Sequence, residues 1–259
     1  MHSMGRILFA VILTIALSAR AAIQRETVEY ADGDTVLEGT LVYDDAIKTA
    51  RDGVIIFHEW AGPRDYELSR ADQIAGLGYA TFVADMYGKG VRPEGPEACR
   101  AEVMKYYGDR DLTRRRAGAA LQAFKKQRPV FQQEFVAIGY CFGGMCALEL
   151  ARNGAKLAGV VSFHGSPDTP APDGSNVKCP LRVYHGADDP HVTAAQVKAF
   201  EDEMTAAGVD FTVVAYPGAV HRFSNPDAGD NVASGVAYNK EADEKSWAAF
   251  TEFLRTVFD

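Results

Sequence analysis

Six short apolar runs, none of which alternates with polar residues, constrain the fold of this chain more than any other feature of its sequence. A strand that is apolar on both faces must be covered on both faces, as parallel strands are in a sheet flanked by helices. The runs are residues 54–57, 80–83, 135–138, 158–161, 181–184 and 211–214. We therefore expect a mostly parallel sheet of the α/β class.

Segments with helical spacing separate these runs, and a hairpin precedes them. The predicted helices are residues 66–77, 112–127, 145–153, 194–207 and 240–257. Gly78, Gly154 and Gly208 follow three of them and favour a left-handed stop after a helix. Residues 28–43 alternate apolar and polar side chains around Asp32-Gly33, which is typical of a hairpin turn. The pattern predicts a doubly wound sheet with helices on both faces behind an N-terminal β-hairpin, and no linker marks a second domain.

The first residues are expected to direct export. A basic residue and an apolar stretch, residues 6–17, precede Ala19 and Ala21, whose small side chains suit a cleavage site after Ala21. The stretch is shorter than the roughly 20 apolar residues that span a bilayer. We therefore expect residues 1–21 to be a signal peptide and residues 22–259 to form one domain in the periplasm or outside the cell. A retained anchor, or a cytoplasmic protein with a mis-assigned start, are the alternatives.

The composition argues against nucleic acid as a partner. The chain has 27 Lys and Arg against 35 Asp and Glu, for a formal net charge of −8, without a block of like charge. Binding to phosphate backbones depends on clustered basic groups, which this chain lacks. Its four cysteines are too few for a disulfide scaffold, and their spacing gives no zinc signature.

One glycine-rich segment has the form of a nucleophile elbow. Gly139-Tyr140-Cys141-Phe142-Gly143-Gly144 lies between a predicted strand and a predicted helix, with Cys in place of the usual Ser. The N-terminus of the following helix points unpaired N–H groups at the sulfur and favours a thiolate there. We expect Cys141 to be the nucleophile and the backbone N–H of Phe142 to be an oxyanion donor. The alternative is a tight turn with a packed thiol.

A base and an acid follow in the order that α/β-hydrolases use. His221 comes shortly after the last predicted strand and is the only histidine late enough to follow an acid loop. That loop contains both Asp188 and Asp189, after the run at 181–184. The spacing of Asp189 from the flanking Gly and Val favours it as the acid that orients the histidine, with Asp188 as a solvated or turn-forming neighbour.

Four separated motifs together resemble the dienelactone hydrolase family of α/β-hydrolases. They are residues 58–62, 139–144, 185–190 and 218–221, and the resemblance extends over residues 27–258. It implies an α/β-hydrolase fold and a triad of Cys141, His221 and Asp189. It also implies hydrolysis of a small ester or lactone through a thioester, without a metal or an organic cofactor.

The resemblance assigns roles outside the triad as well. Glu59 matches a glutamate that contacts the resting cysteine in this family. A carboxylate beside a thiol disfavours the thiolate, so Glu59 would protect the sulfur from oxidation until substrate arrives. The backbone N–H of Trp60 is the expected second oxyanion donor.

Substrate binding is where this chain departs from the family. Dienelactone hydrolases hold the substrate carboxylate with two arginines, and here Lys89 and Asn225 stand at those positions, with Arg222 nearby. A lysine lacks the bidentate fork of an arginine. Lys89 and Arg222 are therefore candidate substrate-binding residues, and an ester or lactone other than the anionic dienelactone suits the sequence equally well.

Two other functions remain open at this point. The chain could be a ligand-binding α/β-hydrolase homologue without activity, although the intact triad argues against it. It could also be a thiol redox protein, which would require a resolving cysteine beside Cys141. Cys146 lies on the same predicted helix but faces elsewhere. A carboxylic ester hydrolase acting on a small molecule is the favoured interpretation.

Overall fold

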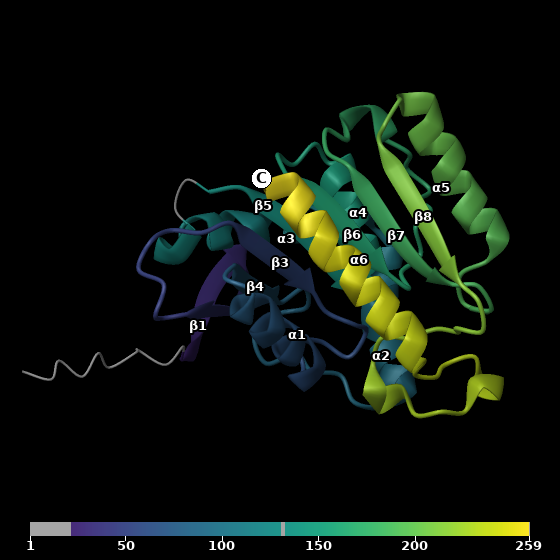
Figure 1. The fold of residues 1–259 in the computed structure, drawn as a ribbon, viewed down its shortest axis with the longest axis horizontal. Helices are drawn as coiled ribbons and strands as arrows, with labels where there is room; N and C mark the ends of the chain where they lie inside the picture. Colours follow the sequence, from purple (N-terminus) through teal and green to yellow (C-terminus); the bar gives the residue numbers. More distant parts are fainter. Residues whose placement is uncertain (1–21, 131–132, 259) are drawn as a thin grey trace, which may run out of the picture.

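A computed structural model describes residues 22–130 and 133–258 of the chain (Figure 1). The predicted signal peptide lies outside the described residues. The chain begins with the expected hairpin, formed by β1 (Ile23–Asp32) and β2 (Thr35–Asp44). Gly33 occupies its turn with a positive φ of 58°. Within the described ranges, no helix is both long enough and apolar enough to cross a membrane.

The strands form one eight-stranded sheet in the order β1-β2-β4-β3-β5-β6-β7-β8. The hairpin pairs antiparallel with β4, and all later neighbours pair parallel. The remaining strands are β3 (Gly53–Phe57), β4 (Ala80–Ala84), β5 (Phe135–Tyr140), β6 (Gly159–Phe163), β7 (Leu181–Gly186) and β8 (Phe211–Tyr216). They match the six apolar runs to within two residues, which confirms the predicted parallel sheet.

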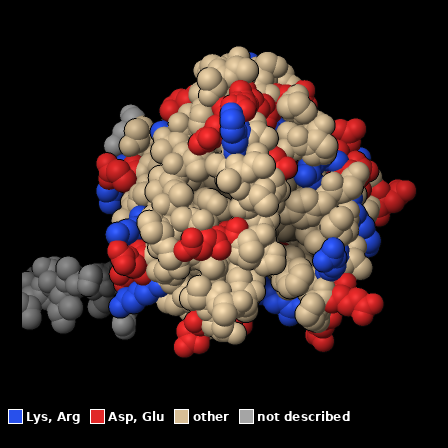
Figure 2. Space-filling model, turned by 90° about the vertical axis from the view of Figure 1, so that its right-hand side faces the viewer, with Lys and Arg blue, Asp and Glu red and all other residues tan. Residues whose placement is uncertain are grey.

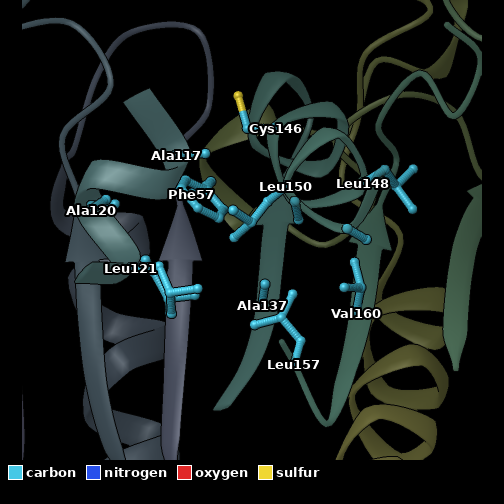
Figure 3. Packing of buried hydrophobic residues seen from close by; sticks show 14 of the residues in the cluster. Phe57, Ala117, Ala120, Leu121, Ala137, Cys146, Leu148, Leu150, Leu157 and Val160 are labelled. Atoms are coloured by element: carbon cyan, nitrogen blue, oxygen red, sulfur yellow. The ribbon is translucent and has the colours of Figure 1, made fainter. Parts of the chain in front are cut away.

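Helices cover both faces of the sheet, as expected for a doubly wound fold (Figure 1). One face packs against α1 (Asp65–Gly76) and α6 (Lys240–Phe258). The other packs against α2 (Gly95–Gly108), α3 (Arg110–Lys125), α4 (Phe142–Arg152) and α5 (Ala194–Ala207). Figure 3 shows this second core, in which Leu148 and Leu150 of α4 lie over Ala137 of β5 and Val160 of β6.

Helix α2 is the one α-helix of the described residues that the sequence pattern did not predict. Gly95, with a φ of 77°, and the proline after it break the pattern where this helix begins. Only Cys99, Val103 and Tyr106 of the helix are buried, so its apolar residues are too sparse to produce a clear helical period. The helix lies over the core on the α3 and α4 side.

Candidate active site

A sharp turn between β5 and α4 places Cys141 at the carboxyl end of the sheet. Cys141 adopts a φ of 54° and a ψ of −116°, a conformation that is rare for residues with a side chain. A Cβ atom on Gly139 would lie 2.0 Å from the carbonyl oxygen of Gly143, and one on Gly143 would lie 2.0 Å from that of Phe57. The glycines of the predicted elbow are therefore required because the backbones pack directly against each other.

The structure brings together the three residues of the predicted triad. The Nε2 atom of His221 lies 3.0 Å from the Sγ atom of Cys141. Its Nδ1 atom lies 2.8 Å from Oδ2 of Asp189. The other oxygen of Asp189 accepts the backbone N–H of His191 at 2.7 Å. Asp188 instead accepts the backbone N–H of Gly218 at 3.1 Å, as a turn-forming neighbour does.

The electrostatics of this array favour a charged histidine. Burial disfavours the imidazolium, but the Cys141 sulfur and the Asp189 carboxylate outweigh burial and raise the pKa of His221 to about 10. An imidazolium next to a sulfur stabilises the thiolate. The array can therefore hold a proton on His221.

Two backbone N–H groups, which the sequence predicts as oxyanion donors, have no hydrogen-bond acceptor among the described residues. Within the described residues, the amides of Trp60 and Phe142 donate no hydrogen bond, and Phe142 is the first residue of α4. The backbone at Trp60 is fixed by a hydrogen bond of 2.8 Å from the hydroxyl of Tyr87 to the carbonyl oxygen of Trp60. Both amides are the ones that the sequence predicted.

The loop that carries Trp60 is fixed by two buried side chains. His58 donates from Nδ1 to the carbonyl of Glu59 at 2.6 Å and accepts the N–H of Met86 on Nε2 at 3.1 Å. Glu67 accepts the N–H of Glu59 at 2.9 Å and that of Arg64 at 3.0 Å. Sequence reasoning missed the role of Glu67, because Arg64 stands at the N-cap, where the capping-box pattern has Ser or Thr before such a Glu.

Glu59 is bound by a second loop rather than by the cysteine. Its carboxylate accepts from Nε of Arg222 at 2.9 and 3.0 Å and from Nδ2 of Asn225 at 3.0 Å. Within the described residues no hydrogen bond joins Glu59 to Cys141. Burial opposes the charge of Arg222, but Glu59 and the Cys141 sulfur raise the pKa of Arg222, so the guanidinium is also part of the electrostatic surroundings of the sulfur.

The two candidate carboxylate-binding cations are both paired within the protein. Lys89 is exposed and pairs with Glu29 and Glu38 of the N-terminal hairpin, with 3.5 Å between Nζ and the Glu38 carboxylate. The two carboxylates therefore balance the charge of Lys89, and its role in substrate binding stays a prediction. Arg222 lies at the site but is occupied by Glu59.

A pocket of about 480 Å³ opens beside the Trp60 loop. Its walls include Glu59, Trp60, Arg64, Glu67, Arg222 and Asn225.

On the face drawn in Figure 2, acidic and basic side chains are interspersed around uncharged ones, so the net negative charge does not collect into one patch there.

The remaining cysteines form no disulfide among the described residues. All four cysteines are free, and Cys99, Cys146 and Cys179 are buried. Burial raises the pKa of Cys146 and of Cys179, which makes both thiols poor nucleophiles. Within residues 22–130 and 133–258, no group of three or more His, Cys, Asp or Glu side chains is placed to hold a metal ion.

Comparisons with known proteins agree with the fold and with the motifs. A dienelactone hydrolase-like promiscuous phosphotriesterase from metagenomic libraries has 38% sequence identity and a TM-score of 0.87, over 92% of this chain and all of the other. A solved structure named m3DLH has 35% identity and a TM-score of 0.88 over the same shares.

A Caenorhabditis elegans protein, K02A2.1, is 37% identical over 146 residues, which are 55% of this chain and 92% of the other. The sequence model of the dienelactone hydrolase family matches residues 38–258, from β2 to the end of α6. The match agrees with the eight-stranded sheet and with the strand-to-helix turn at Cys141. The chain therefore belongs to the dienelactone hydrolase family.

Proposed function

We propose that this protein hydrolyses a small carboxylic ester or lactone with Cys141 as the nucleophile. The observation that carries the proposal is the continuous array from the Cys141 sulfur, 3.0 Å from His221, to Asp189, 2.8 Å beyond it. The array lies at the carboxyl end of the sheet, where ligands bind in open α/β folds. Its charges suit a thiolate and an imidazolium.

In the first half of the reaction, the thiolate of Cys141 attacks the carbonyl carbon and forms a carbon–sulfur bond. The carbonyl oxygen becomes an oxyanion that the amides of Trp60 and Phe142 bind. As the tetrahedral intermediate collapses, the carbon–oxygen bond to the leaving group breaks, and that group takes the proton of His221. The product of this half is a thioester on Cys141.

In the second half, His221 accepts a proton from water, which attacks the thioester carbonyl. Collapse of the second intermediate breaks the carbon–sulfur bond and releases the acid and the thiolate. A thiolate is itself a good leaving group, so the first intermediate reverts when the alcohol leaves poorly. Enol esters and lactones, whose leaving group is a stabilised enolate, therefore suit this site better than amides.

The substrate class that fits best is an uncharged ester. Lys89 and Arg222, the two cations considered for a substrate carboxylate, are each paired with carboxylates of the chain. An anionic substrate would have to displace Glu59 from Arg222 to gain a partner. An uncharged acyl group needs only the two amides and the sulfur.

The test is turnover of p-nitrophenyl acetate by the protein and by its Cys141→Ala variant. We expect Cys141→Ala to abolish turnover, while Cys99→Ala, at a buried cysteine on α2, retains it. Undiminished turnover by Cys141→Ala would overturn the proposal. Binding of ester without release of nitrophenolate by the unaltered protein would favour the ligand-binding alternative, and a disulfide at Cys141 found by mass spectrometry would favour the redox alternative.

A second candidate activity is hydrolysis of phosphotriesters. It is favoured by the 38% identity, over all of that chain, to a relative whose name gives it promiscuous phosphotriesterase activity. A phosphoryl oxygen can accept hydrogen bonds from the same two amides that would bind an ester oxyanion. Release of nitrophenolate from paraoxon, lost in Cys141→Ala, would support this activity; release that persists in the variant would contradict it.

We also propose that the protein is exported after cleavage near Ala21, on the pattern of its first residues. The expected result is recovery from the periplasmic or extracellular fraction of a protein that begins at residue 22. Recovery of uncleaved protein from the cytoplasm would contradict export.

A further inference from the structure

Three residues with side chains adopt left-handed backbone conformations in the described part of the chain. They are Cys141 with a φ of 54°, His164 with a φ of 42° and Arg222 with a φ of 58°. Each conformation is costly for a residue with a Cβ atom, so the surrounding contacts must hold it. Cys141 follows β5, His164 follows β6, and Arg222 follows the triad histidine.

The imidazole of His164 joins two of these segments. Its Nδ1 atom accepts the backbone N–H of Cys141 at 3.1 Å, and the same N–H also donates to the carbonyl of Phe163 at 2.9 Å. Its Nε2 atom lies 2.9 Å from the hydroxyl oxygen of Ser224. Since Nδ1 accepts, the ring proton is on Nε2 and is donated to Ser224. Burial, followed by the nearby charge of His221, lowers the pKa of His164, which keeps the ring in this neutral form.

Ser224 lies inside the turn that binds Glu59. The turn is closed by a hydrogen bond of 2.9 Å from the N–H of Asn225 to the carbonyl of Arg222. Arg222 and Asn225 are the two residues that bind the Glu59 carboxylate. The hydroxyl of Ser224 therefore lies between two contacts. On one side is His164, which binds the backbone of Cys141, and on the other is the turn of Arg222 and Asn225, which binds Glu59.

The other side of Ser224 is anchored to helix α1. The Tyr66 hydroxyl lies 2.7 Å from Oγ of Ser224 and donates to its carbonyl at 3.1 Å. Nη2 of Arg70 donates to the same carbonyl at 2.7 Å, and Arg70 pairs with Asp243 of α6. Each of these side chains is buried, so the network is shielded from water.

We propose that His164 and Ser224 are positioning residues that couple the turn of Cys141 to the turn that holds Glu59. The inference rests on the proposed cysteine chemistry and deepens it. When the Ser224 hydroxyl is present, the His164 proton is held on Nε2 and Nδ1 stays free to accept the Cys141 N–H. When the hydroxyl is lost, the ring loses its fixed tautomer, and the Arg222–Asn225 turn loses the contact that ties it to the nucleophile.

The experiment is a double-mutant cycle between Ser224→Ala and Glu59→Gln. We expect Ser224→Ala to lower kcat by about tenfold with little change in KM. In the Glu59→Gln background, the same substitution is expected to lower kcat by about threefold or less. An equal effect in both backgrounds would overturn the coupling, as would an unchanged kcat in the single variant.

Ser162→Ala is the matched control. Ser162 is a fully buried serine of β6, and its hydroxyl has no hydrogen-bond partner within the described residues. We expect its kcat to stay within about twofold of the parent. A tenfold loss in Ser162→Ala would mean that removal of any buried hydroxyl near this strand disturbs the site, and the assignment of Ser224 would fail.

Two further measurements separate this inference from the proposed function and from simple unfolding. The rate at which iodoacetamide alkylates Cys141 reports on the sulfur without any ester, so the cycle can be completed even if Cys141→Ala retains esterase activity. Ser224→Thr keeps the hydroxyl and is expected to recover most of the kcat that Ser224→Ala loses. Failure of Ser224→Thr to exceed Ser224→Ala, with both variants folded by circular dichroism, would contradict a role for the hydroxyl.

Discussion

Arg222 places its guanidinium against both carboxylate oxygens of Glu59, with Nε 2.9 Å from Oε1 and Nη2 2.8 Å from Oε2. The two residues are 163 positions apart in the chain and lie on loops that flank the sulfur. The side chain of Glu59 is 7% exposed and that of Arg222 is 24% exposed, so the pair is shielded from water more than a surface ion pair is. Removing one partner leaves a poorly hydrated charge.

Arg222→Gln is therefore expected to lower the free energy of unfolding by about 2 kcal/mol, less than the roughly 3–5 kcal/mol of a fully buried pair because the arginine is partly exposed. The double variant with Glu59→Gln should recover part of that loss. Urea unfolding at pH 7 measures both. Arg25→Gln, which breaks the exposed pair with Asp72, is the control and should change stability by roughly 0.5 kcal/mol or less.

The two neighbouring aspartates of the acid loop are expected to differ strongly in their effect on turnover. Asp189 bonds to the triad histidine, whereas Asp188 bonds to a backbone N–H of a turn. Asp189→Asn should lower kcat by about 10³ or more, because the histidine loses both its orientation and its charge partner. Asp188→Asn should stay within about threefold. Similar losses in both variants, measured with p-nitrophenyl acetate, would contradict the assignment of Asp189.

Stability should depend on pH through His221. Its pKa is about 10 in the folded protein, above the ordinary value of 6.5, so between these values the folded state binds more protons than the unfolded state. The stabilisation is fully present below about pH 6.5 and is lost as pH rises through about 10. The advantage of the parent protein over His221→Gln in urea unfolding should thus shrink from pH 6 to pH 10; an advantage that grows over this range would show the sign to be wrong.

His58 should act in the opposite direction. Burial lowers its pKa from 6.5 to about 4, so the unfolded state binds more protons between these values. The stability contributed by neutral His58 is present above about pH 6.5 and is lost as pH falls toward 4, by roughly 1 kcal/mol per pH unit. Unfolding curves at pH 7.5 and 5 should show this loss in the parent protein. If the unfolding free energy of His58→Asn falls between pH 7.5 and pH 5 as steeply as that of the parent protein, His58 is not the source of the loss.

A methyl group on Gly143 should prevent the native turn. Its Cβ atom would lie 2.0 Å from a backbone oxygen of β3, which cannot move without disturbing the sheet. Gly143→Ala is expected to lower the free energy of unfolding by more than about 4 kcal/mol or to abolish folding. In contrast, Gly118→Ala in the interior of α3 meets no atom within 4 Å and should be neutral or stabilising by up to about 1 kcal/mol. Thermal unfolding of the two variants tests the contrast.

The sequence was sufficient to predict the sheet because each central strand is covered on both faces and is therefore apolar along its whole length. The proximity of Cys141, His221 and Asp189 could be predicted because these residues stand beside strand ends in a recognisable order. Helix α2 could not, since the few residues that it buries leave no regular period. Its position depends on tertiary packing, which local pattern does not encode.

The environment of Glu59 was predictable only in part. Local sequence suggested an acid beside the sulfur, but not that Arg222 and Asn225 would bind it, since that contact depends on how two distant loops meet. The ion pairs of Lys89 were not predictable for a related reason. Its partners Glu29 and Glu38 lie on the hairpin, and the antiparallel pairing of β2 with β4 brings them next to the residue.

The crowding around Gly139 and Gly143 has a consequence for how such a protein can change. Every atom that would clash on substitution belongs to the backbone, whereas the side chain of Cys141 is only partly buried. Positions 139 and 143 therefore have room only for glycine, whereas the side chain at position 141 can be replaced by another of similar size. A single substitution can therefore exchange sulfur for oxygen at position 141 while the backbone of the turn stays unaltered, so a new reactivity can be sampled without first rebuilding the turn.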